Sequence, residues 1–466
     1  MKKNVIIVLV ALFVLMLPGC SRSTSGSSGQ GTQAASGPVQ ITQPVTVTLW
    51  TSPDWAGIWE ANEPGAGYGD FYRYAGTEFN KQNPNVTVHV ESVPGAEAVQ
   101  KFAVALQSNT MPDIYVNTEF TVYDYAHAGL LEPLNSIIEP ADYEDIPKAL
   151  WDMVSTNGDV YVYPFYNESG HLVINVSLFE QYGINPADYI KEYGGPDEIG
   201  RWTPDEFRNL LRAVKPKLPS NVYPYGFWCG SAMGDTFNRL MMTMFGGSNF
   251  DPVTKKSTSN SPENVQALQF LVDCYREGLF APGAETLTVL DVYQLVLNKQ
   301  LAVGIFNNVN YDNLVQGLAN GTIPGPFEFK MMFLPRVGDP TCYAYIKGSC
   351  VFKQSNAMQT EAAKQFVKFF SSGPMAKGSL AMLPHRLSVA KMMDDPRKIA
   401  IVESSKYAGD FWMQVPGYNA LRRMFFPTLQ AALTGAKTPQ QALDDFTRES
   451  NELIEDYIAD SVFFKK

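Results

Sequence analysis

Residues that could serve as catalytic bases, nucleophiles or metal ligands are few in this sequence, and they form no catalytic pattern. Histidine occurs only four times, and no pair has the HExxH spacing that holds zinc on one helix face. The GxSxG turn of serine hydrolases and the phosphate-binding GxxxxGK loop are absent. Paired carboxylates for glycoside hydrolysis stay an open alternative, since such pairs meet only in the folded chain. The histidines are His89, His127, His171 and His385.

Two segments look like ligand loops but lack the necessary residues. Gly65-Ala66-Gly67-Tyr68-Gly69 is rich in glycine, yet it follows no predicted strand and lacks the full dinucleotide-binding spacing. The segment 251–263 has the outline of a calcium loop, but Val253 and Lys255 stand where oxygen ligands are required. The sequence therefore predicts neither a metal site nor a cofactor, and favours a protein that is not an enzyme.

The cysteines also argue against zinc. There are five, with no CxxC pair and no cysteine–histidine cluster. Cys342 and Cys350 could form a disulfide if they lie on paired strands, and the alternative is that both are buried free thiols. The remaining cysteines are Cys20, Cys229 and Cys274.

The N-terminus has the features of an export signal. Lys2 and Lys3 precede an unbroken apolar run over 5–17, which is shorter than a membrane span and typical of a secretory signal. Leu17-Pro18-Gly19-Cys20 resembles the lipobox of bacterial lipoproteins, which implies cleavage after residue 19 and a lipid on Cys20. The alternative is an ordinary signal peptide with an incidental cysteine. Residues 20–43 are mostly small and polar, and we expect a flexible tether there.

Composition limits the remaining classes of protein. The chain has 466 residues, of which 45% are hydrophobic and 18% charged, so it can bury a large core. Its formal net charge of −11 argues against a nucleic-acid partner, which requires a basic surface. Aromatic residues make up 12% of the chain, which suits both burial and a cleft where rings stack.

The elements that would position a site alternate between strand and helix. Strands are predicted over 45–50, 86–90 and 112–116, and helices over 70–81 and around Val99, Phe102, Ala103 and Leu106. This alternation is typical of a parallel sheet covered by helices. Capping residues mark three later helix starts at Thr203, Ser261 and Thr438. The length exceeds what one core supports, so we expect two α/β lobes.

Several segments, taken in order, resemble a known family. The sequence is similar to the extracellular solute-binding proteins of bacterial ABC importers, in the sugar-binding branch that includes maltose- and glycerol-3-phosphate-binding proteins. The stretch 56–74 departs from that pattern by being longer and more aromatic. The matching segments are the lipobox and residues 49–51, 79–86, 111–114, 129–134, 161–166, 202–207, 260–263 and 433–439.

The resemblance implies a periplasmic-binding-protein type II fold, with a sheet flanked by helices in each lobe and a ligand cleft between them. It implies a signal peptide over 1–19, a first lobe over 44–164 plus 335–380 and a second over 165–334 plus 381–466. Crossings between the lobes are expected near Pro164, near Leu334-Pro335 and over 379–383. Ligand binding would then favour closure of the hinge.

The resemblance also implies ligand-binding residues in the first lobe and at the hinge. Asp54 and Trp55 follow the first strand, and Asp54 matches a position that binds sugar hydroxyls. Glu119 and Glu168 match acidic ligand contacts of the family. Tyr166 adds a hydrogen-bonding group beside Glu168.

In the second lobe the expected contacts combine rings, amides and arginine. Trp228 and Trp412 are expected to stack on sugar rings. Gly348 is expected where a side chain would crowd the cleft. Arg422 could fork onto hydroxyls or a phosphate. The remaining candidates are Asn307 and Asn308 after a strand, and Arg386, which could instead brace the hinge.

Together these features predict a monomeric, lipid-anchored substrate-binding component of an ABC transporter. It would capture a carbohydrate at the outer face of the cell membrane, or in the periplasm, and deliver it to the permease subunits. One alternative ligand is a phosphorylated polyol such as glycerol 3-phosphate, suggested by Arg422. Further alternatives are a surface glycan-binding protein without a transport role and a glycan-processing enzyme.

Overall fold

The computed structural model of the chain describes residues 39–51, 70–93, 95–230, 234–409, 415 and 417–463. For Glu119 and Asn308 it describes the backbone but not the side chain. Asp54, Trp55, Trp412 and Cys20 lie outside the described residues, as do the predicted signal peptide and most of the tether.

A single mixed sheet organises the described chain. Seven of its nine strands follow the order β2-β1-β3-β12-β6-β10-β7, and the other two, β11 and β13, each pair with β6. β1 is parallel to β2 and β3, whereas β12 runs antiparallel to both β3 and β6. The strands are β1 (Val45–Thr51), β2 (Val86–Ser92), β3 (Ile114–Thr118), β6 (Tyr163–Asn175), β7 (Tyr223–Tyr225), β10 (Leu301–Asn307), β11 (Phe329–Met332), β12 (Tyr343–Val351) and β13 (Leu383–Pro384).

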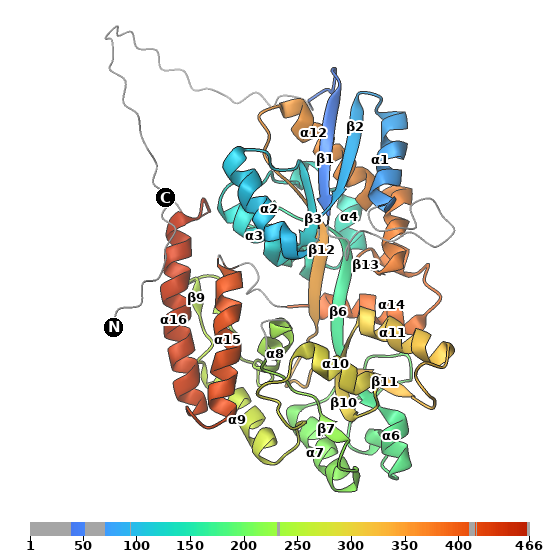
Figure 1. Cartoon of the computed structure of the whole chain (residues 1–466), viewed down its shortest axis with the longest axis vertical. Coiled ribbons are helices and arrows are strands. Elements are labelled where there is room, and N and C mark those ends of the chain that lie inside the picture. The colour runs from blue at the N-terminus through green and yellow to red at the C-terminus, as the bar shows by residue number, and fades with distance from the viewer. Residues whose placement is uncertain are drawn as a thin grey trace. The chain divides into compact units, whose positions relative to one another are not determined.

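The long strands β6 and β12 run between two groups of shorter strands. β1, β2 and β3 lie at one end, which we call the first lobe, and β7, β10 and β11 lie at the other, which we call the second lobe (Figure 1). β12 pairs with the early part of β6, and β10 pairs with its later part. Pro164 therefore lies at the start of a crossing strand. The exact boundaries of the lobes stay a prediction.

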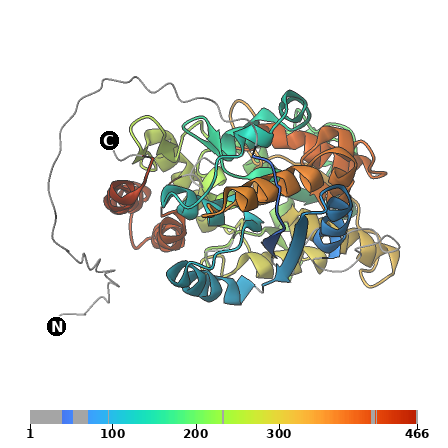
Figure 2. The same cartoon turned by 90° about the horizontal axis from the view of Figure 1, so that it is seen from above.

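Helices cover the sheet in both lobes. α1 and α12 pack on β2 and β1, α10 and α7 pack on β10 and β7, and α15 lies beside α16 (Figure 2). The helices are α1 (Asp70–Gln82), α2 (Gly95–Ser108), α3 (Glu119–His127), α4 (Pro140–Asp145), α5 (Lys148–Met153), α6 (Val176–Gln181), α7 (Pro204–Val214), α8 (Asp235–Met241), α9 (Pro262–Arg276), α10 (Val289–Leu297), α11 (Asn308–Ala319), α12 (Ala357–Ser371), α13 (Leu387–Ala390), α14 (Pro396–Ser404), α15 (Tyr418–Leu433) and α16 (Pro439–Asp460). Two short hairpins join β4 (Ser155–Thr156) to β5 (Asp159–Val160) and β8 (Phe250–Asp251) to β9 (Lys256–Ser257).

Helix starts with local capping signals are confirmed. Thr203 and Thr438 each form a capping box, in which the threonine oxygen accepts from the N–H three residues on and that residue's side chain accepts from the threonine N–H. Ser261 caps α9, and Gly278, which adopts a φ of 65°, follows the end of that helix. These signals act within one turn of chain, so they need no tertiary information.

One local detail differs from expectation, and one alternative left open by the sequence is decided. The apolar face of α2 buries Phe102 and Ala105, whereas Leu106 is 46% exposed and Ala103 also faces solvent, because the helix is rotated toward β1 and β3 by its packing. Cys342 and Cys350 are both buried free thiols. Cys350 lies on β12, and Cys342 is the residue directly before that strand. The two cysteines therefore belong to the same strand region and are not opposite each other on paired strands.

Candidate ligand-binding site

The carboxyl ends of β3 and β10 approach the crossing strands from opposite lobes. Thr118, the last residue of β3, pairs with Lys347 on β12, and Asn307, the last residue of β10, pairs with Gly170 on β6. A helix follows each of these ends, α3 after β3 and α11 after β10. Ligand sites of α/β sheets form at the carboxyl ends of strands, where the loops and helix N-termini are free to meet a ligand.

Four side chains link these two ends in an unbroken polar row. The Nζ of Lys347 donates to Thr118 Oγ1 at 2.7 Å and lies 3.4 Å from Glu168 Oε2. The Nδ2 of Asn307 donates to Glu168 Oε1 at 3.1 Å. The row therefore crosses β3, β12, β6 and β10 in order, and we call it the crossing polar row. The Lys347 side chain is 3% exposed and the Glu168 side chain is 22% exposed, so a solute can reach the carboxylate but not the ammonium.

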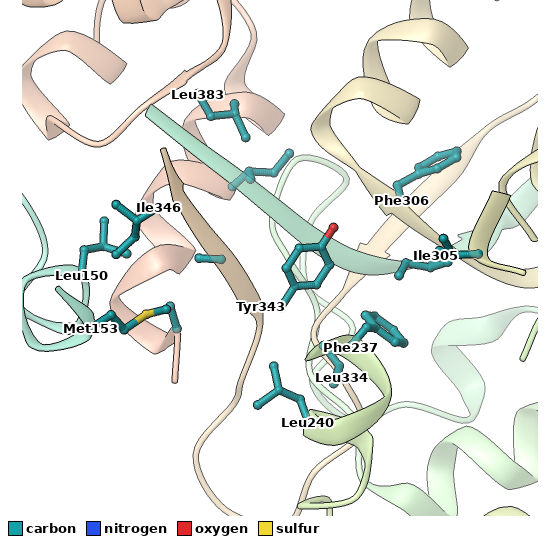
Figure 3. Close-up of a cluster of buried hydrophobic side chains, with 14 of the residues drawn as sticks. Leu150, Met153, Phe237, Leu240, Ile305, Phe306, Leu334, Tyr343, Ile346 and Leu383 are labelled. Atoms are coloured by element: carbon teal, nitrogen blue, oxygen red, sulfur yellow. The ribbon is translucent and has the colours of Figure 1, made fainter. Parts of the chain in front are cut away.

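Two tyrosines extend this polar surface along β12. Residues 343, 345 and 347 are two positions apart along β12, so their side chains share one face of the strand. Tyr345 pairs with Glu168, and the Tyr343 ring lies over Gly170, where a Cβ atom would come within 1.8 Å of the ring. The Tyr343 and Phe237 ring centroids lie 6.2 Å apart, and Figure 3 shows Ile346 directed toward Leu150 and Met153. Burial raises the pKa of both tyrosines well above the usual value, so they stay neutral.

The buried carboxylate of Asp235, on α8, contacts two arginines and a tyrosine near Tyr345. Asp235 Oδ1 accepts from Arg422 Nε at 3.0 Å and from Arg422 Nη2 at 2.6 Å, and its Oδ2 accepts from the Tyr418 hydroxyl at 2.7 Å. Arg239 lies 3.5 Å from the same carboxylate. The Tyr345 hydroxyl donates to Thr236 Oγ1 at 3.1 Å, which joins this group to β12. We call Asp235, Arg239, Tyr418 and Arg422 the Asp235 cluster.

Several of the predicted site residues are brought together here. Glu168 and Asn307 are members of the crossing polar row, and Arg422 belongs to the Asp235 cluster. Tyr166 lies on β6 opposite Lys347 and is fully buried. At Gly348 an added Cβ would lie 2.4 Å from the Tyr163 carbonyl oxygen, so this glycine permits close approach of β12 to β6.

Other predicted residues lie elsewhere or have undescribed side chains. Trp228 is fully buried in the second lobe, where it packs against Phe237. Arg386 pairs with Asp142 at 2.6 Å and donates to the Tyr163 hydroxyl at 3.0 Å, so it braces α4 against β6. Glu119 and Asn308 begin α3 and α11, on either side of the crossing polar row, and their roles stay predictions.

Lys347, Tyr345 and Asp235 were not predicted from the sequence. The alternation in Tyr343-Ala344-Tyr345-Ile346-Lys347 is a usable signal, since it indicates a strand with one polar, aromatic face. Asp235 carries no comparable signal, because its arginine partner Arg422 lies far away in the chain.

The described part of the chain contains no group of histidine, cysteine and carboxylate side chains suited to hold a metal ion. Nor does any helix in that part have the length and apolar character needed to cross a membrane.

The comparisons with known proteins agree with this architecture. A model described as bacterial extracellular solute-binding protein matches residues 63–374, and the chain belongs to this family. The chain is 21% identical over 331 residues to the maltotriose-binding protein of Pyrococcus abyssi, covering 68% of this chain and 63% of that protein. The match thus spans less than two thirds of the relative's length.

Solved structures show the same fold. The cyclic alpha-maltosyl-1,6-maltose binding protein from Arthrobacter globiformis has a TM-score of 0.69 at 22% identity, over 89% of this chain and 100% of that one. The sugar-binding protein MalE from Xanthomonas citri has a TM-score of 0.69 at 18% identity, over 88% and 98%. The chain therefore has the two-lobed α/β fold of solute-binding proteins, and its family and neighbours are binding proteins.

Proposed function

We propose that this protein captures a neutral sugar or oligosaccharide between its lobes and delivers it to the permease subunits of an ABC importer. One observation carries the proposal. The surface at the meeting point of the lobes combines a reachable carboxylate, an amide and the partly exposed Tyr345, which are groups that bind sugar hydroxyls and pack against sugar C–H faces. The names of the relatives, which bind maltotriose and a cyclic maltosyl-maltose, support the same class of ligand.

The pairing of the cations with carboxylates favours a neutral ligand over a phosphorylated polyol. Lys347 is paired with Glu168, and Arg422 and Arg239 are both beside Asp235. An anionic ligand would have to compete with these carboxylates for cations that are already engaged. Arg422, which suggested a phosphate site, is committed to Asp235 in this structure.

The crossing polar row also suggests how binding is coupled to closure. Thr118 belongs to the first lobe and Asn307 to the second, and the strands between them carry Lys347 and Glu168. A sugar bound to Glu168 and to groups of both lobes would favour the closed arrangement, because only that arrangement provides all of its contacts. The predicted lipid on Cys20 would hold this protein at the membrane beside the permease.

Calorimetry of the purified chain against glucose, maltose, maltotriose and longer or cyclic maltosaccharides tests the ligand class. We expect binding, and we expect Glu168→Gln to weaken it about tenfold or more, since a hydrogen bond to a charged group contributes about 1.5–3 kcal/mol. Glu180→Gln, the same change at an exposed position of α6, is the control and should bind as wild type does. Absence of binding across the sugars, or sugar recovered in a cleaved form, would contradict the proposal.

The anchor needs a separate test. Cells expressing the full chain with labelled palmitate should incorporate label into the wild type but not into Cys20→Ser. Equal labelling of both proteins, or none of either, would contradict lipidation at this residue.

A further inference from the structure

A small pocket in the second lobe is lined by an excess of cationic side chains. It has a volume of about 170 Å3 and lies between the loop that precedes α7 and the segment leading from β11 to β12. Three of its lining residues are basic, namely Lys191, Arg201 and Arg336, and two are acidic, namely Glu192 and Glu206. None of these residues belongs to the crossing polar row or the Asp235 cluster, so the pocket is separate from the site described above.

Arg336 is the innermost of these cations and makes no ion pair with a described residue. Its Nη1 donates to Thr243 Oγ1 at 2.6 Å, and its backbone N–H donates to the Trp202 carbonyl. Burial lowers the pKa of its guanidinium, and the charge of Asp339 acts on that pKa in the opposite direction. A partly buried guanidinium that has a hydroxyl but no carboxylate in contact is an incompletely compensated charge.

The other two cations leave donors available at the mouth of the pocket. The Lys191 ammonium makes no hydrogen bond or ion pair with a described side chain. Arg201 donates through Nη2 to the Tyr407 hydroxyl at 3.0 Å and stacks on that ring. Its Nη1 lies 3.9 Å from Glu192, in a pair whose side chains are 44% and 70% exposed and therefore weakly coupled.

The second carboxylate of the pocket, that of Glu206, already accepts hydrogen bonds from backbone N–H groups. Glu206 accepts from the Thr203 N–H at 2.8 Å, from Thr203 Oγ1 at 3.1 Å and from the Lys191 N–H at 3.2 Å. It therefore caps the start of α7 and does not neutralise Arg336 or the Lys191 ammonium through contact. The N-terminus of α7 contributes a further partial positive charge to the same place.

We propose that this pocket is a binding site for a small tetrahedral oxyanion such as inorganic phosphate or sulfate. Arg336 would hold the ion from within, and Lys191 and Arg201 would close over it from the rim. A pocket of this size is below the roughly 300–1,000 Å3 of sites for larger organic ligands, but it admits an ion of a few atoms. The site is independent of the sugar-binding function.

Calorimetry of the full chain with inorganic phosphate, at an ionic strength held constant with chloride, tests the proposal. Sulfate provides a second tetrahedral ion, and acetate a planar one of lower charge. We expect one ion per chain for phosphate and sulfate, with weaker binding of acetate. Arg336→Gln should weaken phosphate binding about ten- to hundredfold, because it removes a charge-assisted hydrogen bond. Arg276→Gln, at an exposed arginine of α9, is the matched control.

Lys191→Gln keeps the test valid if Arg336→Gln fails to fold, since Lys191 is exposed and its side chain makes no hydrogen bond or ion pair with the residues that the structure describes. This variant should lose several-fold in phosphate affinity while its circular dichroism and its sugar binding stay as in the wild type. Absence of phosphate and sulfate binding in the wild type would overturn the proposal. So would phosphate affinity unchanged by both substitutions, which would place the ion elsewhere.

Discussion

Lys347 on β12 and Glu168 on β6 form an ion pair with 3.4 Å between Nζ and Oε2, although they are not direct partners in the ladder. Tyr345 is the residue opposite Glu168, and Lys347 lies opposite Tyr166, so the pair is diagonal on one face of the two strands. The same ammonium donates to Thr118 at the end of β3. One lysine thereby connects the first lobe to the carboxylate that we expect to bind the sugar.

Lys347→Met should destabilise the protein by about 2–4 kcal/mol, because it leaves Glu168 without its cation in a mostly buried position. Urea unfolding followed by circular dichroism measures the change. The control is Lys148→Met, which removes the exposed i,i+4 partner of Asp152 and should alter the unfolding midpoint little. Equal effects of the two substitutions would contradict a special role for the crossing polar row.

Gly170→Ala should be poorly tolerated, because the new methyl group would overlap the Tyr343 ring. We expect a loss of about 1–3 kcal/mol in the free energy of unfolding, as for other overpacked sites. Gly409→Ala, where no atom of the described residues lies within 4 Å of the added Cβ, provides the matched comparison. A double substitution Gly170→Ala with Tyr343→Leu should recover part of the loss, and failure to do so would rule out this clash as its cause.

Acid should weaken the fold through two buried histidines before most carboxylates titrate. Burial lowers the pKa of His171 and of His385 to about 3, so both stay neutral in the native state between pH 6.5 and pH 3. The unfolded chain binds a proton at each in that window, and the free energy of unfolding therefore falls as the pH falls. The loss is about 2 kcal/mol per histidine between pH 8 and pH 5.

Urea unfolding of the wild type and of His171→Gln at pH 8 and pH 5 measures this term. The variant should show a smaller drop than the wild type between the two pH values, because one titrating group is gone. A drop of the same size in both proteins would show that His171 does not contribute.

Arg386→Met should destabilise the fold while leaving sugar affinity nearly unchanged. Its guanidinium lies among Asp142, Asp145 and Tyr163, and the side chain is 9% exposed. Removal of one partner from such a buried group costs about 3–5 kcal/mol. Arg448→Met removes a solvent-exposed arginine from α16 and should have little effect. If Arg386→Met abolished sugar binding in a folded protein, the residue would be a ligand contact after all.

Local structure followed from local sequence wherever the signal fits within a few residues. The capping boxes at Thr203 and Thr438, the strand predicted over 45–50 and the helix stop at Gly278 are all confirmed. The predicted buried face of α2 was wrong at Ala103 and Leu106. The helix has more apolar residues than one of its faces can bury. Which of them is covered depends on the strands beneath.

The candidate site shows the same division. Glu168 was predicted because it matches an acidic contact of the family, and Asn307 because it follows a strand. The structure brings the Asn307 amide within 3.1 Å of the Glu168 carboxylate. Trp228 was predicted by its type alone, and a large apolar ring fits a core as well as a cleft. Lys347 was missed because its partners come from β3 and β6, which meet it only through sheet pairing.

The order of the amino acids alone determined the family resemblance, the export signal pattern and the elements whose caps and periodicity act at short range. The tertiary structure alone decided that Thr118, Lys347, Glu168 and Asn307 form one row, and that Asp235 engages Arg422. The physical reason is that charge compensation depends on distance in space, and the residues concerned are separated by up to 229 positions in the chain.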